Sequence, residues 1–410
     1  MRAELPRQVG VPRQVGVSRH GEVPRRANRS AVLAHVLARG SVTRTVLGQE
    51  TGLSPATVSR IVEQLLAEGL LSETDGAPGT GRGRRATPVT IETGRTVVCG
   101  VDLGGSNVRI LVADLAAKPL VIKTVATPTG RDAGELARWL AQLILDTVGD
   151  YRPLLDSVAV GLPGAVRRDD RSVSNAPNLR QVEHADFLHI LEQRVGMSVE
   201  VDNDSNYALL GELRFGAARD AQTAVMFTVG AGLGAGVALD RRLFHGRTGL
   251  VGEFGHLPAG PLGTSLEQLV SGPGILARAR ELRLPFDNPA DVFHSSDPRL
   301  APVKQHIEQA LLIILTAAVV AYEPEVIILG GGISHGLEPG LERLNERLCE
   351  IVPTAATVQS AELGDLAGAL GAVVAALHTT YRGLGLDDLH LSHVPHREAL
   401  TGFDIRAASL

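Results

Sequence analysis

The pattern of hydrophobic and polar residues along the chain changes near residue 95. Between residues 28 and 69, apolar residues recur at helical spacing, and Gly40 and Gly69 end two of the runs, which predicts short amphipathic helices. After residue 96, short apolar runs end in glycine, asparagine or aspartate, which is typical of buried strands. The pattern therefore predicts a small helical domain at residues 28–92 and a larger α/β domain at residues 96–380.

The larger domain begins with the stretch VVCGVDLGGSNVRILV at Val97–Val112. Two apolar runs flank Gly104 and Gly105, which predicts two antiparallel strands joined by a glycine turn. Backbone N–H groups in such a turn can approach an anion, and Asp102 would face the same point, where it could hold a metal directly or through water. Because D-x-G-G also occurs in ordinary hairpins, this interpretation depends on the segments that follow.

Later strands are predicted to end in similar chemistry. We expect a helix near residues 136–145 and buried strands at residues 158–160, 199–201, 223–228 and 326–329. These strands lead into GLPG, DNDSN, a glycine series from Gly230 to Gly236, and Gly330–Gly332, respectively. The amide-rich loop NAPNL separates the first two. The expected architecture is two α/β lobes, each with a strand hairpin that could close on phosphates.

The helical domain contains the sequence GLSPATVSRIV at Gly52–Val62. Gly52 suits a tight turn, Ser54 an N-cap and Pro55 the first helical position, while an aliphatic stripe faces inward. The outward residues at the start of this helix lie where a recognition helix meets bases and phosphates. The predicted DNA contacts on this helix are Ser54, Thr57, Ser59 and Arg60.

A predicted hairpin follows, with strands near residues 70–71 and 88–91 and the tip GAPGTGRGRR between them. Flexible glycine with interleaved Arg82, Arg84 and Arg85 suits contact with a minor groove or with phosphates, although a single basic loop is more often a solvated turn. Directly after a helix-turn-helix, such a hairpin favours a winged helix-turn-helix.

The distribution of charge supports DNA contact by the head. Residues 1–90 carry 13 arginines and no lysine against seven acidic residues, whereas the whole chain has a net charge of -5. A basic head on an acidic body indicates nucleic-acid contact confined to the head. Residues 1–27 contain a PRQVGV repeat without helical or strand period and are expected to be a disordered basic arm, which either touches DNA phosphates or is dispensable.

Composition narrows the class of protein further. The chain has 410 residues, 44% hydrophobic and 3% aromatic, so it can bury two or three cores of mainly aliphatic side chains. Cys99 and Cys349 lie far apart in apolar contexts and are expected to be buried thiols in a reducing cytoplasm. We see no apolar run of about 20 residues and no signal segment, so a cytoplasmic protein without a membrane partner is expected. Residues 381–410 are expected to be a C-terminal tail.

In order along the chain, DLGGSNVR, GLPGAV, NAPNL, DNDSN, TVGAGLGAGV, GEFGH and LGGGI resemble the motifs of the ROK family of repressors, open reading frames and sugar kinases. The resemblance covers residues 28–377. It implies a two-lobed actin-like ATPase and sugar-kinase fold, which is ribonuclease H-like, after the winged helix-turn-helix domain. Members with such a head look like transcriptional regulators of carbohydrate metabolism, whereas those that begin at the phosphate hairpin are kinases.

The resemblance also implies roles for particular residues. Asp204 matches the catalytic base of the family's kinases, which would accept the proton of a sugar hydroxyl. The implied sugar contacts are Asn178, Asn203, Asp204, Glu253, His256 and Glu267. The implied nucleotide contacts are Asp102, which would lie near Mg²⁺, and Gly104, Gly105, Ser106, Gly230, Gly232, Gly234, Gly331 and Gly332.

Each of these assignments has a structural alternative. Asp204 could cap the following helix, glycine hairpins could persist for the fold alone, and His256 could be structural. The family usually follows its Glu-x-Gly-His motif with three cysteines that bind zinc together with the histidine, but LPAGPLGTSLEQLVSG follows here. A structural zinc site needs about four ligands, so we predict no zinc and no other bound metal. Loss of the zinc loop weakens the sugar assignment of His256 and Glu267.

Three functions fit these features. The preferred one is a DNA-binding transcriptional regulator, expected to be a repressor, which senses a sugar or sugar phosphate and requires no cofactor. It would bind an inverted-repeat operator as a homodimer or a dimer of dimers. The second is an ATP-dependent sugar kinase with a DNA-binding head, which would need ATP and Mg²⁺ and against which the lost zinc loop argues. The third is a regulator whose body is a ligand-blind dimerisation module.

Overall fold

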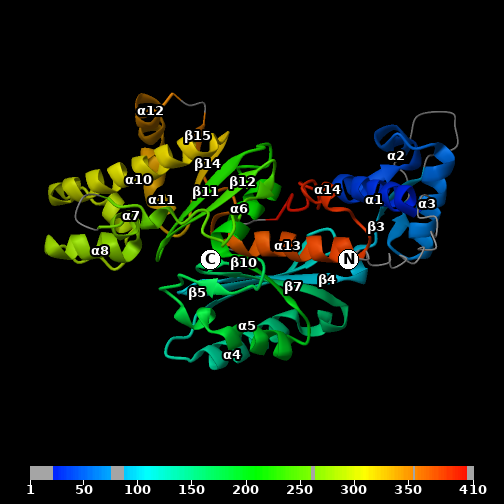
Figure 1. Ribbon diagram of the computed structural model, residues 1–410, viewed down its shortest axis with the longest axis horizontal. Helices are drawn as coiled ribbons and strands as arrows, with labels where there is room; N and C mark the ends of the chain where they lie inside the picture. Colours follow the sequence, from blue (N-terminus) through cyan, green and yellow to red (C-terminus); the bar gives the residue numbers. More distant parts are fainter. Residues whose placement is uncertain (1–21, 75–86, 260–263, 354–355, 404–410) are drawn as a thin grey trace, which may run out of the picture.

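The computed structural model describes residues 22–74, 87–259, 264–353 and 356–403. A head formed by the first helices lies at one end of the molecule, and two lobes with separate sheets form the rest (Figure 1). The predicted architecture of a winged helix-turn-helix followed by two α/β lobes is confirmed.

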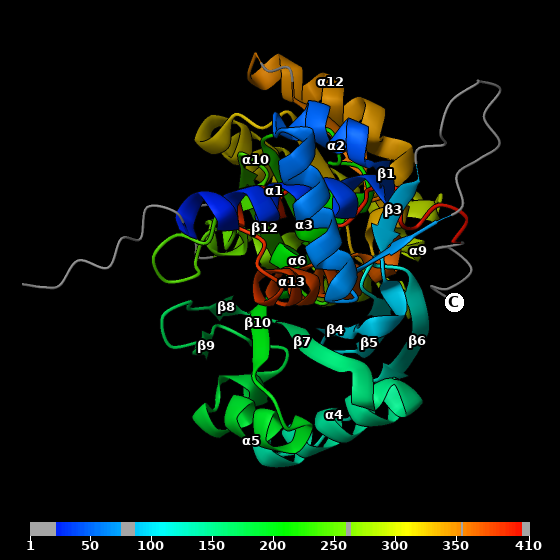
Figure 2. The same cartoon turned by 90° about the vertical axis from the view of Figure 1, so that its right-hand side faces the viewer.

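The head combines three helices with a small antiparallel sheet (Figure 2). Gly40 and Gly52 have φ values of 72° and 69°, the left-handed backbone that favours glycine. Gly40 follows α1 as expected, and Gly52, expected in a tight turn, is the C-cap of α2. Thr43 caps α2 through its hydroxyl, which accepts a hydrogen bond from the backbone N–H of Val46. The helices are α1 (Glu22–Arg39), α2 (Arg44–Thr51) and α3 (Pro55–Ala67), and the strand order is β1 (Ser41–Thr43), β3 (Pro88–Ile91) and β2 (Leu71–Glu73).

The first lobe is a five-stranded mixed sheet in the order β10-β7-β4-β5-β6. The predicted glycine hairpin is confirmed, because β4 and β5 pair antiparallel across Gly104 and Gly105. A short ribbon, β8 with β9, extends from the edge near β10. The strands are β4 (Val97–Leu103), β5 (Asn107–Asp114), β6 (Pro119–Ala126), β7 (Leu155–Leu162), β8 (Ala165–Val166), β9 (Val173–Ser174) and β10 (Val199–Asn203); α4 (Ala133–Val148) and α5 (Ala185–Val195) cover the outer face.

The second lobe is also a five-stranded sheet, in the order β13-β12-β11-β14-β15. The second predicted hairpin is confirmed by the antiparallel pairing of β11 with β12. The strands are β11 (Ala224–Val229), β12 (Leu233–Leu239), β13 (Arg242–Leu243), β14 (Val326–Gly330) and β15 (Thr357–Ser360). The helices of this lobe are α7 (Leu266–Val270), α8 (Gly272–Glu281), α9 (Asp291–His294), α10 (Ala301–Tyr322), α11 (Ser334–Leu337) and α12 (Leu341–Ile351).

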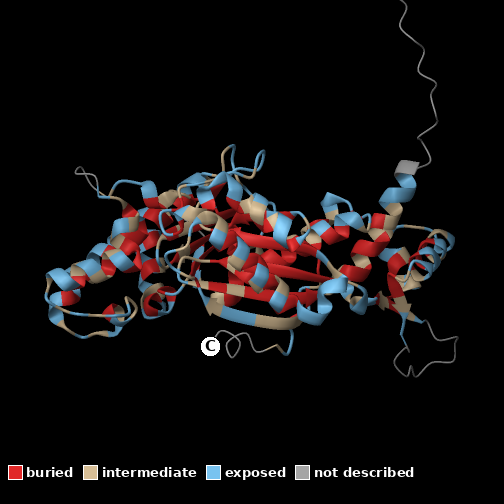
Figure 3. Ribbon diagram, turned by 90° about the horizontal axis from the view of Figure 1, so that it is seen from below, coloured by how far each residue is buried: buried red, intermediate tan, exposed pale blue. Residues whose placement is uncertain are grey.

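Two helices, α6 (Asp204–Phe215) and α13 (Ala367–Gly383), lie between the lobes and contact strands of the central sheets. Their axes approach closely because glycines face each other: a Cβ atom on Gly211 would lie 2.6 Å from the carbonyl oxygen of Ala367. Figure 3 shows buried residues concentrated in the strands and in the helices beside them. This core fixes the ends of β4, β7 and β10, which border the start of α6.

The segment after α13 returns to the head rather than forming a loose tail. Short helix α14 (Asp388–Leu391) contacts α1, the carbonyl oxygen of Leu384 accepts a hydrogen bond from Arg29 at 2.5 Å, and the Asp387 N–H donates to the Ser30 hydroxyl at 2.8 Å. The apolar side chains of this segment join the core that the head shares with α6 and α13. Their buried members are Leu386, Leu391, Val394 and Leu400.

The structure corrects several expectations. Residues 22–27 belong to α1 instead of the expected disordered arm, and the described part of residues 381–410 is packed as above. Cys99 is buried as expected, but Cys349 is exposed. The segment of residues 298–322, which includes α10, is long and apolar enough to span a membrane by length and composition. The prediction that the chain has no such apolar run was therefore wrong. One face of α10 is buried in the core of the second lobe, as in core helices of soluble proteins.

Candidate functional site

The centre of the site is the point where β10 ends and α6 begins. Asn203 is the N-cap of α6: its Oδ1 atom accepts hydrogen bonds from the N–H groups of Ser205 at 2.9 Å and Asn206 at 3.2 Å. Its Nδ2 atom donates to the Gly164 carbonyl at 2.9 Å. The side-chain cap of α6 is thus Asn203, whereas Asp204 Oδ1 accepts hydrogen bonds from the N–H and the hydroxyl of Ser205 at 2.7 and 3.2 Å.

Asp204 lies close to a second buried carboxyl group. Burial raises the pKa of Asp204 to about 6, although hydrogen bonds from Ser205 oppose this shift. Burial, and after it the negative charge of Asp204, raise the pKa of Asp102 to about 7, while Arg109 at 3.8 Å from Asp102 opposes the shift. Two carboxyl groups that both titrate near neutral pH are suited to exchanging a proton or to sharing a cation.

A bridge between the lobes completes this polar cluster. The Nδ2 atom of Asn175, in the loop after β9, donates to Glu253 Oε2 at 2.7 Å and lies 2.7 Å from His256 Nε2. Glu253 and His256 themselves lie 3.5 Å apart. Burial raises the pKa of Glu253, and the negative charges of Asp204 and Glu267 raise it further. Glu253 is therefore close enough to both carboxylates to feel their charge. We call Asp102, Asn175, Asp204, Glu253 and His256 the cleft cluster.

Sequence reasoning identified the loop NAPNL but missed Asn175 as a site residue. Its φ of 60° is the left-handed conformation that asparagine tolerates better than most residues. The sequence position between a strand and a proline carried part of this signal, but the contact with Glu253 joins residues 78 positions apart. That contact depends on the arrangement of the two lobes, which local sequence does not encode.

Asn178 and Glu267 lie beside the glycine turns. A Cβ atom on Gly232 would be 2.6 Å from Glu267 Oε1 and 3.2 Å from Asn178 Nδ2, and one on Gly105 would be 3.3 Å from Asn178 Cβ. Turns from the two lobes therefore meet at Asn178. Glu267 Oε1 also accepts a hydrogen bond from the Leu233 N–H at 3.3 Å, so this carboxylate braces the second turn.

The glycines predicted to contact nucleotide differ in their surroundings. A Cβ atom on Gly230 or Gly332 would meet nothing within 4 Å, which leaves room for a ligand. A Cβ atom on Gly234 would instead collide with the hydroxyls of Ser205 and Thr228, so Gly234 is required for packing against α6. Gly331 has a φ of 88° and would meet the Val229 backbone at 2.5 Å. The remaining members of this group, Gly104 and Ser106, lie in the turn between β4 and β5.

The predicted DNA contacts fall on the exposed start of α3. Ser54 is the N-cap, since its hydroxyl accepts from the Thr57 N–H at 3.2 Å, and its Oγ lies 2.9 Å from Thr57 Oγ1. Arg60 is exposed and Ser59 is partly exposed one turn further along. Arg82, Arg84 and Arg85 lie outside the described residues. The four residues of α3 and its cap thus share one end of the helix, as a recognition helix requires.

The metal prediction concerns the loop after His256. Among the residues that the structure describes, which exclude 260–263 of this loop, no group of three or more histidine, cysteine or acidic side chains is arranged to hold a metal ion. The absence of zinc stays a prediction, and so does the absence of a required cofactor.

Two family models divide the chain at the same place as the structure does. The model described as the ROK family matches residues 98–379, and the model described as the MarR family matches residues 24–83. The chain belongs to the ROK family. The MarR-type match covers the winged helix-turn-helix of the head, which agrees with the resemblance noted from the motifs.

Relatives of this ROK-family chain include regulators and kinases. The DNA-binding transcriptional dual regulator NagC of Escherichia coli (strain K12) is 28% identical over 395 residues, 90% of this chain and 96% of NagC. A glucokinase of Thermotoga maritima is 30% identical over 303 residues, 67% of this chain and 95% of the kinase. The fold matches that of a crystallised ROK family transcriptional regulator, a homologue of the E. coli MLC protein, with a TM-score of 0.74 and 22% identity, covering 90% of this chain and 99% of that chain.

Proposed function

We propose that this ROK-family chain is a DNA-binding transcriptional repressor of carbohydrate metabolism whose cleft binds a sugar or a sugar phosphate. The observation that carries the proposal is the joining of a winged helix-turn-helix head to a body whose cleft cluster contains hydrogen-bonding groups of the kind that bind sugar hydroxyls. NagC, which matches 90% of the chain, is itself described as a DNA-binding regulator. The protein would act in the cytoplasm as a homodimer or dimer of dimers on an inverted repeat.

Helix α13 offers a physical connection between the cleft and the head. Near its start, Gly368 lies against the Asp102 side chain, and its end leads to Leu384, whose carbonyl binds Arg29 of α1. A sugar that competes for Glu253 would break the bridge from Asn175 and allow the lobes to reorient. The head would move with them, and DNA affinity would change by the difference in ligand binding between the two arrangements.

The direct test is binding of the full chain to DNA upstream of its own gene, measured by fluorescence anisotropy with and without glucose, N-acetylglucosamine, xylose and their phosphates. We expect one ligand to weaken specific binding by about tenfold, in the usual range of coupling energies. Binding that no ligand alters would favour the ligand-blind regulator. Absence of specific binding would contradict the proposal.

Arg60→Ala provides the variant that separates the two halves of the proposal. Arg60 is exposed on α3, so we expect the variant to lose about tenfold in DNA affinity while sugar binding by calorimetry is unchanged. Arg138→Ala is the matched control, since Arg138 is an exposed arginine on α4 of the first lobe. Equal losses in both variants would show that overall charge, rather than α3, binds the DNA.

A sugar kinase is the second candidate, and the raised pKa of Asp204 favours it. A carboxylate with a pKa of about 6 is a suitable acceptor for a hydroxyl proton near neutral pH. The carboxylate oxygens of Asp102 and Asp204 suit Mg²⁺, which would supply charge neutralisation to the phosphates of ATP, and the open space at Gly230 and Gly332 admits a nucleotide. Sugar-dependent ATP turnover that Asp204→Asn abolishes would establish the kinase, whereas no turnover is expected of the repressor.

A further inference from the structure

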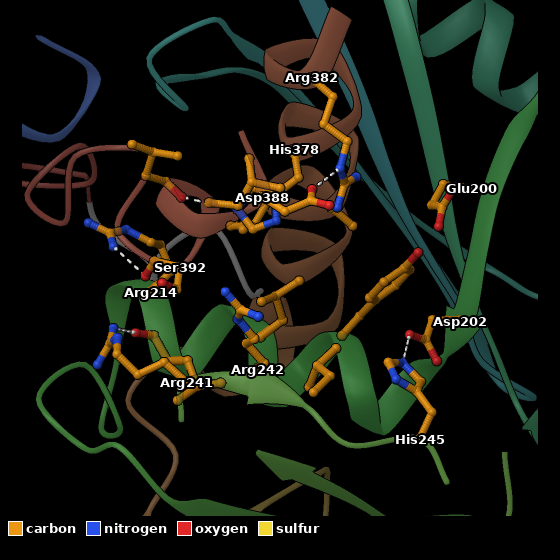
Figure 4. Close-up of a pocket in the computed structure, with 18 of the residues that line it drawn as sticks. Glu200, Asp202, Arg214, Arg241, Arg242, His245, His378, Arg382, Asp388 and Ser392 are labelled. Carbon is orange, nitrogen blue, oxygen red and sulfur yellow. Dashed lines mark hydrogen bonds and ion pairs between the residues drawn. The ribbon is translucent and has the colours of Figure 1, made fainter. Parts of the chain in front are cut away.

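A second polar site lies beside α6, between the body and the segment that follows α13. It is a cavity of about 310 Å³, lined by α6, β13, α13 and residues 388–394. Figure 4 shows Arg242 below Asp388, with the pair formed by Asp202 and His245 to its right. We call this space the arginine cavity.

Positive charge exceeds negative charge in the arginine cavity. Its lining includes five arginines and three carboxylates. Two of the carboxylates already have partners: Asp202 Oδ2 lies 2.6 Å from His245 Nε2, and Asp388 Oδ1 accepts from Arg382 at 2.6 Å. The arginines are Arg168, Arg214, Arg241, Arg242 and Arg382, and the carboxylates are Glu200, Asp202 and Asp388.

Several buried groups of the cavity wall have unused hydrogen-bonding capacity. Arg214 is 8% exposed, and among the described residues its guanidinium group has one hydrogen bond, from Nη1 to the Ser392 carbonyl at 3.4 Å. Within the described residues, the Nε atoms of Arg214 and Arg241 and the hydroxyl of Tyr207 are buried without a hydrogen-bond partner. Arg241 is otherwise satisfied, because its Nη atoms donate to the carbonyl oxygens of Arg219, Ala221 and Leu213 at 2.8, 2.9 and 2.9 Å. Arg214 forms no ion pair with a described residue, and a buried guanidinium group with so few partners is costly, which makes an anionic ligand favourable there.

We propose that the arginine cavity binds a small molecule carrying a phosphate group. Guanidinium groups bind phosphate oxygens through paired, charge-assisted hydrogen bonds, and Arg214 of α6, Arg242 of β13 and Arg382 of α13 all line the cavity. The cavity volume lies at the lower end of the range for small-molecule sites, which suits a metabolite rather than a peptide or nucleic acid. This site is separate from the sugar cleft and does not depend on the proposed sugar response.

The position of the cavity gives the ligand a route to the head. Residues Asp388, Leu391 and Ser392 form part of its wall, and the same segment binds α1 through Leu384 and Asp387. Arg214 and Arg382 contact this segment at Ser392 and Asp388, respectively. A phosphate bound to either arginine would therefore act directly on a side chain that positions the segment. Hydrogen exchange of residues 384–394 is therefore expected to slow when the cavity is filled.

Calorimetry of the full chain with inorganic phosphate and with glucose 6-phosphate tests the inference. We expect saturable binding of both, weakened about tenfold by Arg242→Gln and by Arg214→Met, because each change removes a charge-assisted contact. Arg242 is exposed and forms no ion pair with a described residue, so Arg242→Gln still tests the site if Arg214→Met does not fold. Arg247→Gln is the matched control, an exposed arginine beyond β13 that does not line the cavity.

The outcomes are decisive in both directions. Loss of phosphate binding in Arg242→Gln but not in Arg247→Gln supports the cavity site. No binding by the unaltered chain at millimolar phosphate, or equal affinity in all three variants, overturns it. Glu253→Gln separates the sites. If Glu253→Gln abolishes binding of glucose 6-phosphate and Arg242→Gln does not change it, this compound binds in the cleft and the cavity inference is wrong.

Discussion

The cleft cluster and the arginine cavity both adjoin the start of α6 but differ in the charge of their side chains. Asp204 and Asp102 belong to the cleft cluster, where burial raises both pKa values towards neutrality. Asp202, two residues before Asp204, lines the cavity and is held by His245. The end of β10 and the start of α6 thus supply Asp204, with its raised pKa, to the cleft cluster and Asp202, bound to His245, to the arginine cavity. Adjacent positions in the sequence can serve different sites because the chain turns from strand to helix between them.

The largest expected effect comes from removing the charge of Asp202, the acid that is bound to His245. Asp202→Asn removes the interaction with His245, and Asp202 Oδ1 also accepts from the Asn206 side chain at 2.8 Å. Both groups are almost fully buried, so we expect a loss of about 3 kcal/mol in the free energy of unfolding, measured by urea denaturation. Asp169→Asn, at an exposed position, should change stability little. Equal stability of the two variants would mean that the buried contacts contribute nothing net.

The next effect is a pH dependence that belongs to the cleft. The folded pKa of Asp102, about 7, exceeds the ordinary carboxyl value, so the folded chain binds a proton that the unfolded chain releases above pH 4. Stability should therefore fall as pH rises from about 4 to about 7. Asp102→Asn should be more stable than the unaltered chain at pH 8, by about 2 kcal/mol, and by less at pH 5. Urea denaturation at both pH values measures this difference, and parallel pH profiles would contradict it.

The smallest effect separates the ligands of the two sites. Glu253→Gln alters the bridge to Asn175, and we expect about tenfold weaker sugar binding with unchanged binding of inorganic phosphate. Arg242→Gln should show the reverse, because Arg242 lines the cavity and not the cleft. Calorimetry with both ligands on both variants gives four values. A variant that weakens both ligands equally would show that the sites are coupled through a common structural change.

The sequence predicted those parts of the molecule that local patterns determine. Apolar runs and glycine turns predicted the β4–β5 and β11–β12 hairpins, and the Ser54 cap with Pro55 predicted the start of α3. The sequence did not predict Asn175 as a partner of Glu253. This contact joins residues from separate lobes, so its physical basis is tertiary packing rather than periodicity.

The missed cavity has a similar explanation. Arg214 lies within a helix, Arg241 in a turn and Ser392 in the segment taken for a tail, and none of the three forms a motif. Their shared position follows from the packing of α13 on α6 and from the return of the last residues to the head. Scattered histidines in that segment gave no signal of this packing, whereas its buried leucines and Val394 provide the actual anchor.

The contact of residues 384–403 with α1 also has a consequence for synthesis. Arg29 and its partner Leu384 are separated by 355 positions, so at about 5–20 residues per second the ribosome makes Arg29 roughly 20–70 s before that partner exists. During this interval the head lacks the core contacts that it makes with α13 and the last segment. The complete core of the head can therefore form only after the body has been translated.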